Sequence, residues 1–326
     1  GAAYGSFSAP GFTGTDVSAA MVATGNYNDG TAARSILAGA NVANSWRFAP
    51  GAAQTITFPT TSTATLGVGI ITNAGFSTTL AATDATNSLT AAGNDLYIFV
   101  NQNTLAIQPK IIGTAALVVN GPATLSLRPT FASNTYTGGT FVNAGTLNLQ
   151  AAATFFAIPG DLTINNAAVN MSTTPGQIAP TANIFINGGG SFTLPNYSAI
   201  TTQSFVSLTF TNDGGTGNPL FAFGTPTAAS TIILTSATPI TASNDSFSTT
   251  PLLTGAAAPT LSVLQFSNAS PTITVNSGLA ATGLIVSALI ADNAGMTGPI
   301  IKAGAGTLAL TSPESTFGQP PSRRHP

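Results

Sequence analysis

One short phrase recurs along the chain at an almost constant interval, and it limits the possible folds more than any other feature. The phrase is an alternating apolar run, then Asn, then a tight turn of small residues, then a second alternating run. Four copies place their asparagines at Asn120, Asn143, Asn165 and Asn187, in steps of 23, 22 and 22 residues. An interval of about 22 residues matches one coil of a β-solenoid, in which each coil stacks on the preceding one.

The residues around each asparagine alternate with the period of a β-strand. In Thr-Leu-Asn-Leu (146–149) and Ser-Phe-Thr-Leu (191–194), every second residue is apolar, which sends one set of side chains inward and the other to solvent. Asn and Gly suit the corners between strands because both tolerate a positive φ. We therefore expect an all-β chain that forms a right-handed parallel β-helix (a β-solenoid) of about 22-residue coils. The four asparagines would stack as a ladder of hydrogen-bonded amides.

The alternative fold is a β-sandwich of short hairpins, whose turns also favour Asn and Gly. Its turns should recur roughly every 8–12 residues, without a superimposed period of one coil. The regular interval favours the β-helix.

The composition excludes several classes of protein. Charged residues make up 5% of the chain, against about a quarter in a typical soluble domain, and the net charge is −2. No basic surface for nucleic acid or an anionic membrane is expected. The hydrophobic share of 43% is too high for a disordered chain, and apolar runs are too short for a transmembrane segment. Cysteine is absent, so disulfide and thiol chemistry are excluded.

A longer run adds a family resemblance. Residues 134–149 read Asn-Thr-Tyr-Thr-Gly-Gly-Thr-Phe-Val-Asn-Ala-Gly-Thr-Leu-Asn-Leu, and residues 302–310 read Lys-Ala-Gly-Ala-Gly-Thr-Leu-Ala-Leu. Both resemble the autotransporter-associated β-strand repeat, also called the passenger-associated transport repeat. The resemblance implies a secreted β-helical passenger, exported across an outer membrane or built into a bacterial surface layer or fibre. The residues that carry the repeat motif are Asn134, Thr135, Tyr136, Thr137, Gly138, Gly139, Thr140, Asn143, Gly145, Thr146, Leu147, Leu149, Gly304, Gly306, Thr307, Leu308 and Leu310.

The domain organisation follows from two related stretches. Trp-Arg-Phe at 46–48 and Gln-Thr-Ile-Thr-Phe at 54–58 are echoed near residues 264–275. We expect an N-terminal cap or arm at 1–45, a β-helix of two related repeat units at 46–311, and a C-terminal tail or linker at 312–326. A short helix at 29–37 could cap the first coil, because an open coil end exposes strand edges. A flexible leading arm is the alternative.

The sequence offers no catalytic, metal-binding or cofactor-binding residues. Glycoside hydrolysis needs two carboxylates within about 5–10 Å of each other, and the nine acidic residues are scattered. Asp84 and Asp95 are the closest pair in sequence, but their separation of half a coil predicts different faces. His325 is the single histidine, which excludes nucleophilic triads and transition-metal clusters. A polysaccharide-processing enzyme remains a distant alternative.

Aromatic residues at alternating positions have two interpretations. Trp46, Tyr97, Phe99 and Phe192 are most simply residues that fill or flank the interior of the β-helix. The alternative is a platform for glycans on the outer surface.

Two functions of different classes are consistent with these observations. The first is an extracellular structural protein, a self-associating subunit of a bacterial surface filament, fibre or sheath. The second is the passenger stalk or adhesin of an autotransporter-like secreted protein, with surface glycans or a host cell as partners. The chain begins at Gly1 rather than Met, so we expect that a signal peptide has been removed and that the protein lies outside the cell or on its surface.

Overall fold

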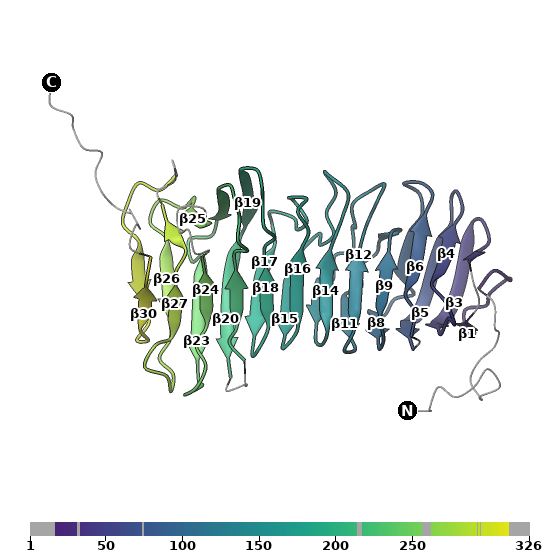
Figure 1. The fold of residues 1–326 in the computed structure, drawn as a ribbon, viewed down its shortest axis with the longest axis horizontal. Coiled ribbons are helices and arrows are strands. Elements are labelled where there is room, and N and C mark those ends of the chain that lie inside the picture. The colour runs from purple at the N-terminus through teal and green to yellow at the C-terminus, as the bar shows by residue number, and fades with distance from the viewer. Residues whose placement is uncertain are drawn as a thin grey trace, which may run out of the picture. The chain divides into compact units, whose positions relative to one another are not determined.

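The computed structural model describes residues 17–30, 33–73, 75–213, 217–255, 262–291, 293 and 295–312 (Figure 1). The chain divides into two compact units, residues 1–160 with 176–178 and residues 161–175 with 179–326. The described residues form β-strands joined by turns and loops, and no α-helix occurs among them. A membrane-spanning helix is therefore not found in this part of the chain.

The first unit contains two sheets of parallel strands. Strands of one sheet are β1 (Asn26–Asp29), β3 (Ala40–Phe48), β5 (Thr63–Thr72), β8 (Leu96–Val100), β11 (Leu117–Asn120) and β13 (Thr140–Val142), with β7 (Ser88–Ala91) and β10 (Lys110–Ile111) beside them. Strands of the other are β2 (Arg34–Ser35), β4 (Gln54–Phe58), β6 (Thr78–Ala82), β9 (Thr104–Ile107), β12 (Thr124–Leu127) and β14 (Thr146–Leu149).

The second unit repeats this plan and adds a third sheet. Its first sheet has β15 (Leu162–Asn165), β17 (Asn183–Asn187), β20 (Ser207–Asn212), β23 (Ile240–Asn244), β26 (Thr272–Val275) and β29 (Ile301–Ala303). Its second has β16 (Ala168–Met171), β18 (Ser191–Thr193), β21 (Leu220–Ala222), β24 (Leu252–Thr254), β27 (Leu284–Val286) and β30 (Leu308–Leu310). The third has β19 (Thr201–Phe205), β22 (Ser230–Leu234), β25 (Ser262–Phe266) and β28 (Leu289–Ile290).

Strand pairing confirms the parallel β-helix. In the first unit, Leu117 pairs with Leu96 on one side and with Thr140 on the other, both in parallel, so successive coils span 21 and 23 residues. Consecutive strands of a hairpin would pair with each other in the antiparallel sense. The sandwich alternative is therefore excluded.

The coils of the second unit lengthen from β17 to β26, and the next one, in which Ile273 pairs with Lys302, is shorter again at 29 residues. Ile184 pairs with Leu208, Leu208 with Ile240, and Ile240 with Ile273, so the coils grow from 24 to 32 and then 33 residues. The added residues build the strands of the third sheet. The 22-residue period thus describes the shorter coils, and the longer ones carry a third strand.

Alternation along each strand produces the core. In β8, Leu96, Ile98 and Val100 are buried, whereas Tyr97 and Phe99 face outward. Large aromatic side chains fill the interior at both units, as for the edge-on pairs Trp46–Phe58 and Phe192–Phe221, whose ring centroids lie 6.2 and 5.2 Å apart. Aromatic rings favour this edge-to-face geometry, so these contacts contribute more to stability than the area they bury.

The start of the first unit differs from the expected helix. Asp29 is the last residue of β1, and Arg34 and Ser35 form β2, which pairs in parallel with β4. The prediction of a helix over 29–37 is therefore wrong for these residues, while Thr31 and Ala32 lie outside the described residues. The strands of the first coil begin at Asn26, within the expected N-terminal cap or arm.

Candidate functional site

Asn134, the first residue of the repeat motif, connects three successive coils of the first unit. Its side-chain Oδ1 accepts a hydrogen bond from the backbone N–H of Ile111 at 2.7 Å, in the preceding coil. Its Nδ2 donates to the carbonyl of Ala157 at 2.7 Å, in the following coil. The side chain is 2% exposed. Because both backbone groups lie in the interior and need a partner, Asn134 acts as a clamp between coils.

Tyr136 fills the space beside this clamp. Its ring is buried, and its hydroxyl shares a hydrogen bond with the Thr140 hydroxyl at 2.6 Å. Burial raises the pKa of Tyr136 well above its usual value, and the bond to Thr140 offsets part of that rise. The backbone N–H groups of Thr135 and Thr137 donate to Ile111 and Gly113, which keeps the segment in register with the preceding coil.

The glycines of the motif permit close contact and sharp turns. A Cβ on Gly138 would lie 2.3 Å from the backbone nitrogen of Ala116. Gly139 and Gly145 have φ values of 83° and 73°, which side chains rarely adopt. A Cβ on Gly145 would also lie 2.3 Å from the carbonyl oxygen of Gly121. These positions therefore require glycine because a side chain would either meet the preceding coil or strain the turn.

The end of the motif supplies core residues. Thr146, Leu147 and Leu149 in β14 lie in register with Thr124, Leu125 and Leu127 in β12, and the leucines are fully buried.

The C-terminal copy of the motif has similar turn glycines in the second unit, but its leucines are less buried, and Leu310 is 39% exposed. Gly304 has a φ of 75°, and a Cβ on Gly306 would lie 2.2 Å from the carbonyl oxygen of Asn276. Thr307 precedes β30, and its carbonyl accepts from the N–H of Gly283 at 2.9 Å. Leu308 and Leu310 pair with Leu284 and Val286 of the preceding coil.

The predicted asparagine turns lie at corresponding corners within each unit. In the second unit, Nδ2 of Asn187 donates to Oδ1 of Asn165 at 2.8 Å, and the two residues are strand partners. In the first unit, Asn120 ends β11, and the N–H of Asn143 donates to the carbonyl of Val119 at 2.9 Å.

Hydrogen bonds between asparagine side chains also occur at corners outside the four predicted turns. In the first unit, Asn101 donates to Asn73 at 2.8 Å, and in the second unit Asn212 donates to Asn244 at 2.9 Å. These bonds satisfy side-chain groups at the points where the chain leaves one sheet for the next.

A buried polar cluster lies at the N-terminal coil of the first unit. The Asp29 carboxylate is fully buried, forms an ion pair with Nε of Arg34 at 3.0 Å, and accepts from Nε2 of Gln54 at 2.9 Å. The N–H of Val17 donates to the same carboxylate at 3.3 Å. The N–H of Val22 donates to the hydroxyl of Tyr27 at 2.9 Å. Residues 17–25 are thus held against the first coil by side chains of β1.

The acidic residues singled out from the sequence belong to separate loops. Asp84 accepts from the N–H and hydroxyl of Thr86, and these bonds hold the pKa of Asp84 below its usual value. Asp95 precedes β8 and accepts from the N–H of Ala116 at 3.1 Å. Within the described ranges, no group of three acidic or histidine side chains is placed to hold a metal ion. His325 and the expected tail from residue 313 onward lie outside the described residues.

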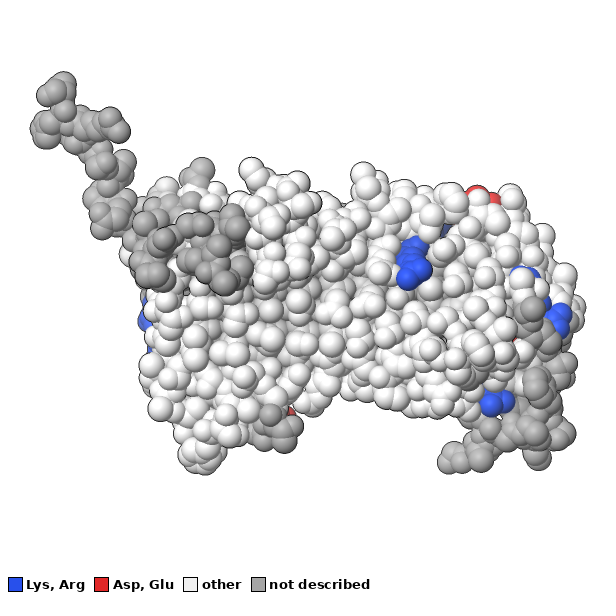
Figure 2. Space-filling view, viewed as in Figure 1, with Lys and Arg blue, Asp and Glu red and all other residues white. Residues whose placement is uncertain are grey.

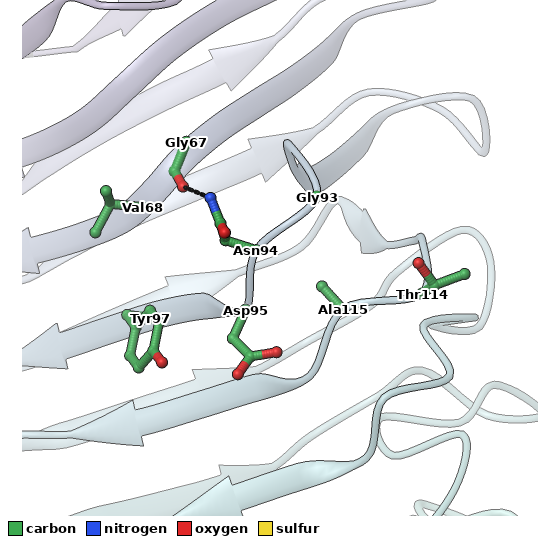
Figure 3. Close-up of a pocket in the computed structure, with 8 residues that line it drawn as sticks. All are labelled: Gly67, Val68, Gly93, Asn94, Asp95, Tyr97, Thr114 and Ala115. Carbon is green, nitrogen blue, oxygen red and sulfur yellow. Dashed lines mark hydrogen bonds between the residues drawn. The ribbon is translucent and has the colours of Figure 1, made fainter.

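A groove on the outer surface of the first unit is a candidate for ligand binding. Its larger part is a cavity of about 520 Å³, and its smaller part, of about 170 Å³, shares Val68 and Tyr97 with it. Figure 3 shows the larger part, in which Asn94 donates to the carbonyl of Gly67 at 3.2 Å. Its lining residues are Gly67, Val68, Gly93, Asn94, Asp95, Tyr97, Thr114 and Ala115.

The structure divides the aromatic residues that the sequence grouped together. Trp46 and Phe192 are fully buried, whereas Tyr97 and Phe99 are 45% and 42% exposed. The alternation in β8 predicts that Tyr97 and Phe99 face outward, because the aliphatic residues between them, such as Ile98, define the inward face. The interpretation as residues that fill the interior holds for Trp46 and Phe192, whereas Tyr97 and Phe99 lie on the outward face of β8.

Comparisons with known proteins agree with the repeat seen in the sequence. A family model described as passenger-associated-transport-repeat matches residues 117–149 and 300–318. No curated protein and no solved structure gives a significant match to the chain. The two matched stretches contain the Asn134 motif and the Gly304 motif, so the resemblance to the passenger-associated transport repeat is confirmed.

Proposed function

We propose that this chain is the β-helical stalk of a secreted, autotransporter-like passenger protein, displayed on the outside of a bacterial cell. The observation that carries the proposal is the use made of the matched repeat. Asn134, Tyr136 and Gly138 build contacts between coils and are buried or enclosed by backbone. A repeat whose residues hold coils together suits a protein that forms a long support and presents another part of the molecule, rather than an enzyme.

The physical chemistry of the coils suits export. Each coil of a solenoid contacts its neighbours, so folding can begin at one coil and propagate along the chain as further residues emerge. No disulfide has to form, because the chain contains no cysteine. On the face shown in Figure 2, charged side chains are few and separated, so the surface that faces solvent there is nearly uncharged.

The filament hypothesis requires open coil ends that stack on one another. At the first coil, residues 17–25 are held against the strands by Asp29 and Tyr27, which covers part of the edge that a second subunit would need. The expected N-terminal cap is supported by these contacts, and we propose that it stops assembly at this end. The passenger stalk is therefore favoured over the self-associating subunit.

Sedimentation velocity distinguishes the two functions. The full chain is measured over a hundredfold range of concentration, with electron microscopy of the same samples. The stalk proposal predicts one species with the mass of a single chain, 32.4 kDa, at every concentration. Ordered filaments, or a mass that increases with concentration, would overturn the proposal in favour of a structural subunit.

A further inference from the structure

We propose that the groove around Tyr97 binds a neutral pyranose sugar of a surface glycan, with the sugar ring packed against the tyrosine. The inference concerns the first unit alone and does not depend on how the chain reaches the cell surface. Its basis is the combination of exposed aromatic rings, a hollow beside them and polar groups at one edge.

The aromatic side of the groove is formed by β8. Tyr97 and Phe99 are two residues apart on the outward face of one strand, so their rings are separated by about 7 Å along it. Tyr97 lines both parts of the groove, and Phe99 lines the smaller one. A pyranose ring has one face of C–H groups, which is apolar enough to leave water for an aromatic ring.

Glycine occupies the neighbouring strand beside the smaller part of the groove. Gly69 lies in register with Tyr97, and a Cβ at Gly69 would come within 1.7 Å of the Tyr97 carbonyl oxygen. A side chain is excluded there by the backbone of the next coil. Val68, which is 49% exposed, forms an apolar wall shared by the two parts of the groove.

Polar groups meet at the other edge, where sugar hydroxyls would lie. One oxygen of Asp95 accepts from the N–H of Ala116, which fixes the orientation of the carboxylate. The side-chain amide of Asn94 donates to Gly67, which leaves its oxygen as an acceptor, and the Thr114 hydroxyl is exposed (Figure 3). The lining of the larger part is mostly polar and that of the smaller part mostly apolar, so together they offer the apolar contact and the oriented polar groups that small-molecule sites combine.

The charges of the groove select the class of glycan. The eight residues that line the larger part include one carboxylate and no lysine or arginine. A sialylated or uronic-acid sugar would be repelled by Asp95 and would find no cation there. A single carboxylate also fails to supply the pair that glycoside hydrolysis requires. The groove is therefore assigned to binding of an uncharged sugar, without cleavage.

The test measures binding of the full chain to immobilised oligosaccharides, using glucose-, galactose- and mannose-based glycans with sialylated counterparts. We expect binding to a subset of the neutral glycans. Tyr97→Ala should weaken it at least tenfold, and Tyr97→Phe, which keeps the ring, should stay within about threefold. The matched control is Phe131→Ala, which removes an aromatic side chain of the first unit that is 42% exposed, close to the 45% of Tyr97, and lies outside the groove. Thermal unfolding of each variant checks that the fold is retained.

Three outcomes of the binding assay would overturn the inference. The first is absence of binding to every neutral glycan, and the second is a preference for the sialylated forms. The third is equal binding by the wild type and Tyr97→Ala. If Tyr97→Ala instead abolishes a dimer seen in sedimentation, the groove is an interface between copies of the chain and the sugar assignment fails.

Discussion

Replacing Asn134 by alanine tests the role assigned to the repeat motif. The substitution removes the acceptor for the N–H of Ile111 and the donor for the carbonyl of Ala157. Both backbone groups bond to a side chain that is 2% exposed, so water has little access to them. Leaving a buried backbone group without a partner costs about 1–3 kcal/mol, so the two together predict a loss of about 2–6 kcal/mol. That loss is a large fraction of the 5–15 kcal/mol, roughly, that stabilises an ordinary domain.

The assay is equilibrium unfolding of the full chain in urea, followed by circular dichroism. Asn187→Ala is the control, because it removes one side-chain hydrogen bond at a part-exposed corner, where water can replace the lost amide. The control should lose less than about 1 kcal/mol. If Asn134→Ala loses no more stability than Asn187→Ala, the motif asparagine is not a clamp between coils.

Three further predictions test separate parts of the structure. Gly138→Ala should destabilise the first unit, because the new Cβ meets the Ala116 backbone, whereas Gly160→Ala meets nothing within 4 Å and should be neutral in thermal unfolding. Leu147→Ala should lower the free energy of unfolding by about 2–5 kcal/mol, and a loss under about 1 kcal/mol would contradict its place in the core. Burial raises the pKa of Tyr197 to about 12, above its unfolded value of about 10. The folded chain therefore keeps this proton where the unfolded chain loses it, so stability should fall between pH 10 and 12, and Tyr197→Phe should flatten that dependence in pH-dependent unfolding.

The sequence predicted the position of a side chain correctly where the local residue pattern determines it. The alternation around Leu147 predicted its burial, and the spacing of Asn165 and Asn187 placed them at neighbouring corners, where they form a hydrogen bond. The Asn-Thr-Tyr run pointed to the repeat before the contacts of Asn134 were known.

The sequence was less informative where distant strands decide the conformation. Residues near Arg34 have local features of a helix start, but pairing with Ile56 makes them a strand. The third sheet was missed because strand β19, for example, is mostly Thr, Gln and Ser and lacks the Asn-containing phrase. The groove depends on Tyr97 and Gly69 meeting across two coils, which no interval within the sequence reveals.

The central claim is that this β-helix is displayed outside the cell. Immunogold labelling of intact cells that produce the full chain, compared with the same cells after permeabilisation, tests it most directly. If the β-helix is displayed at the surface, antibodies against the folded chain should label intact cells as strongly as permeabilised ones. Labelling that appears only after permeabilisation would contradict it.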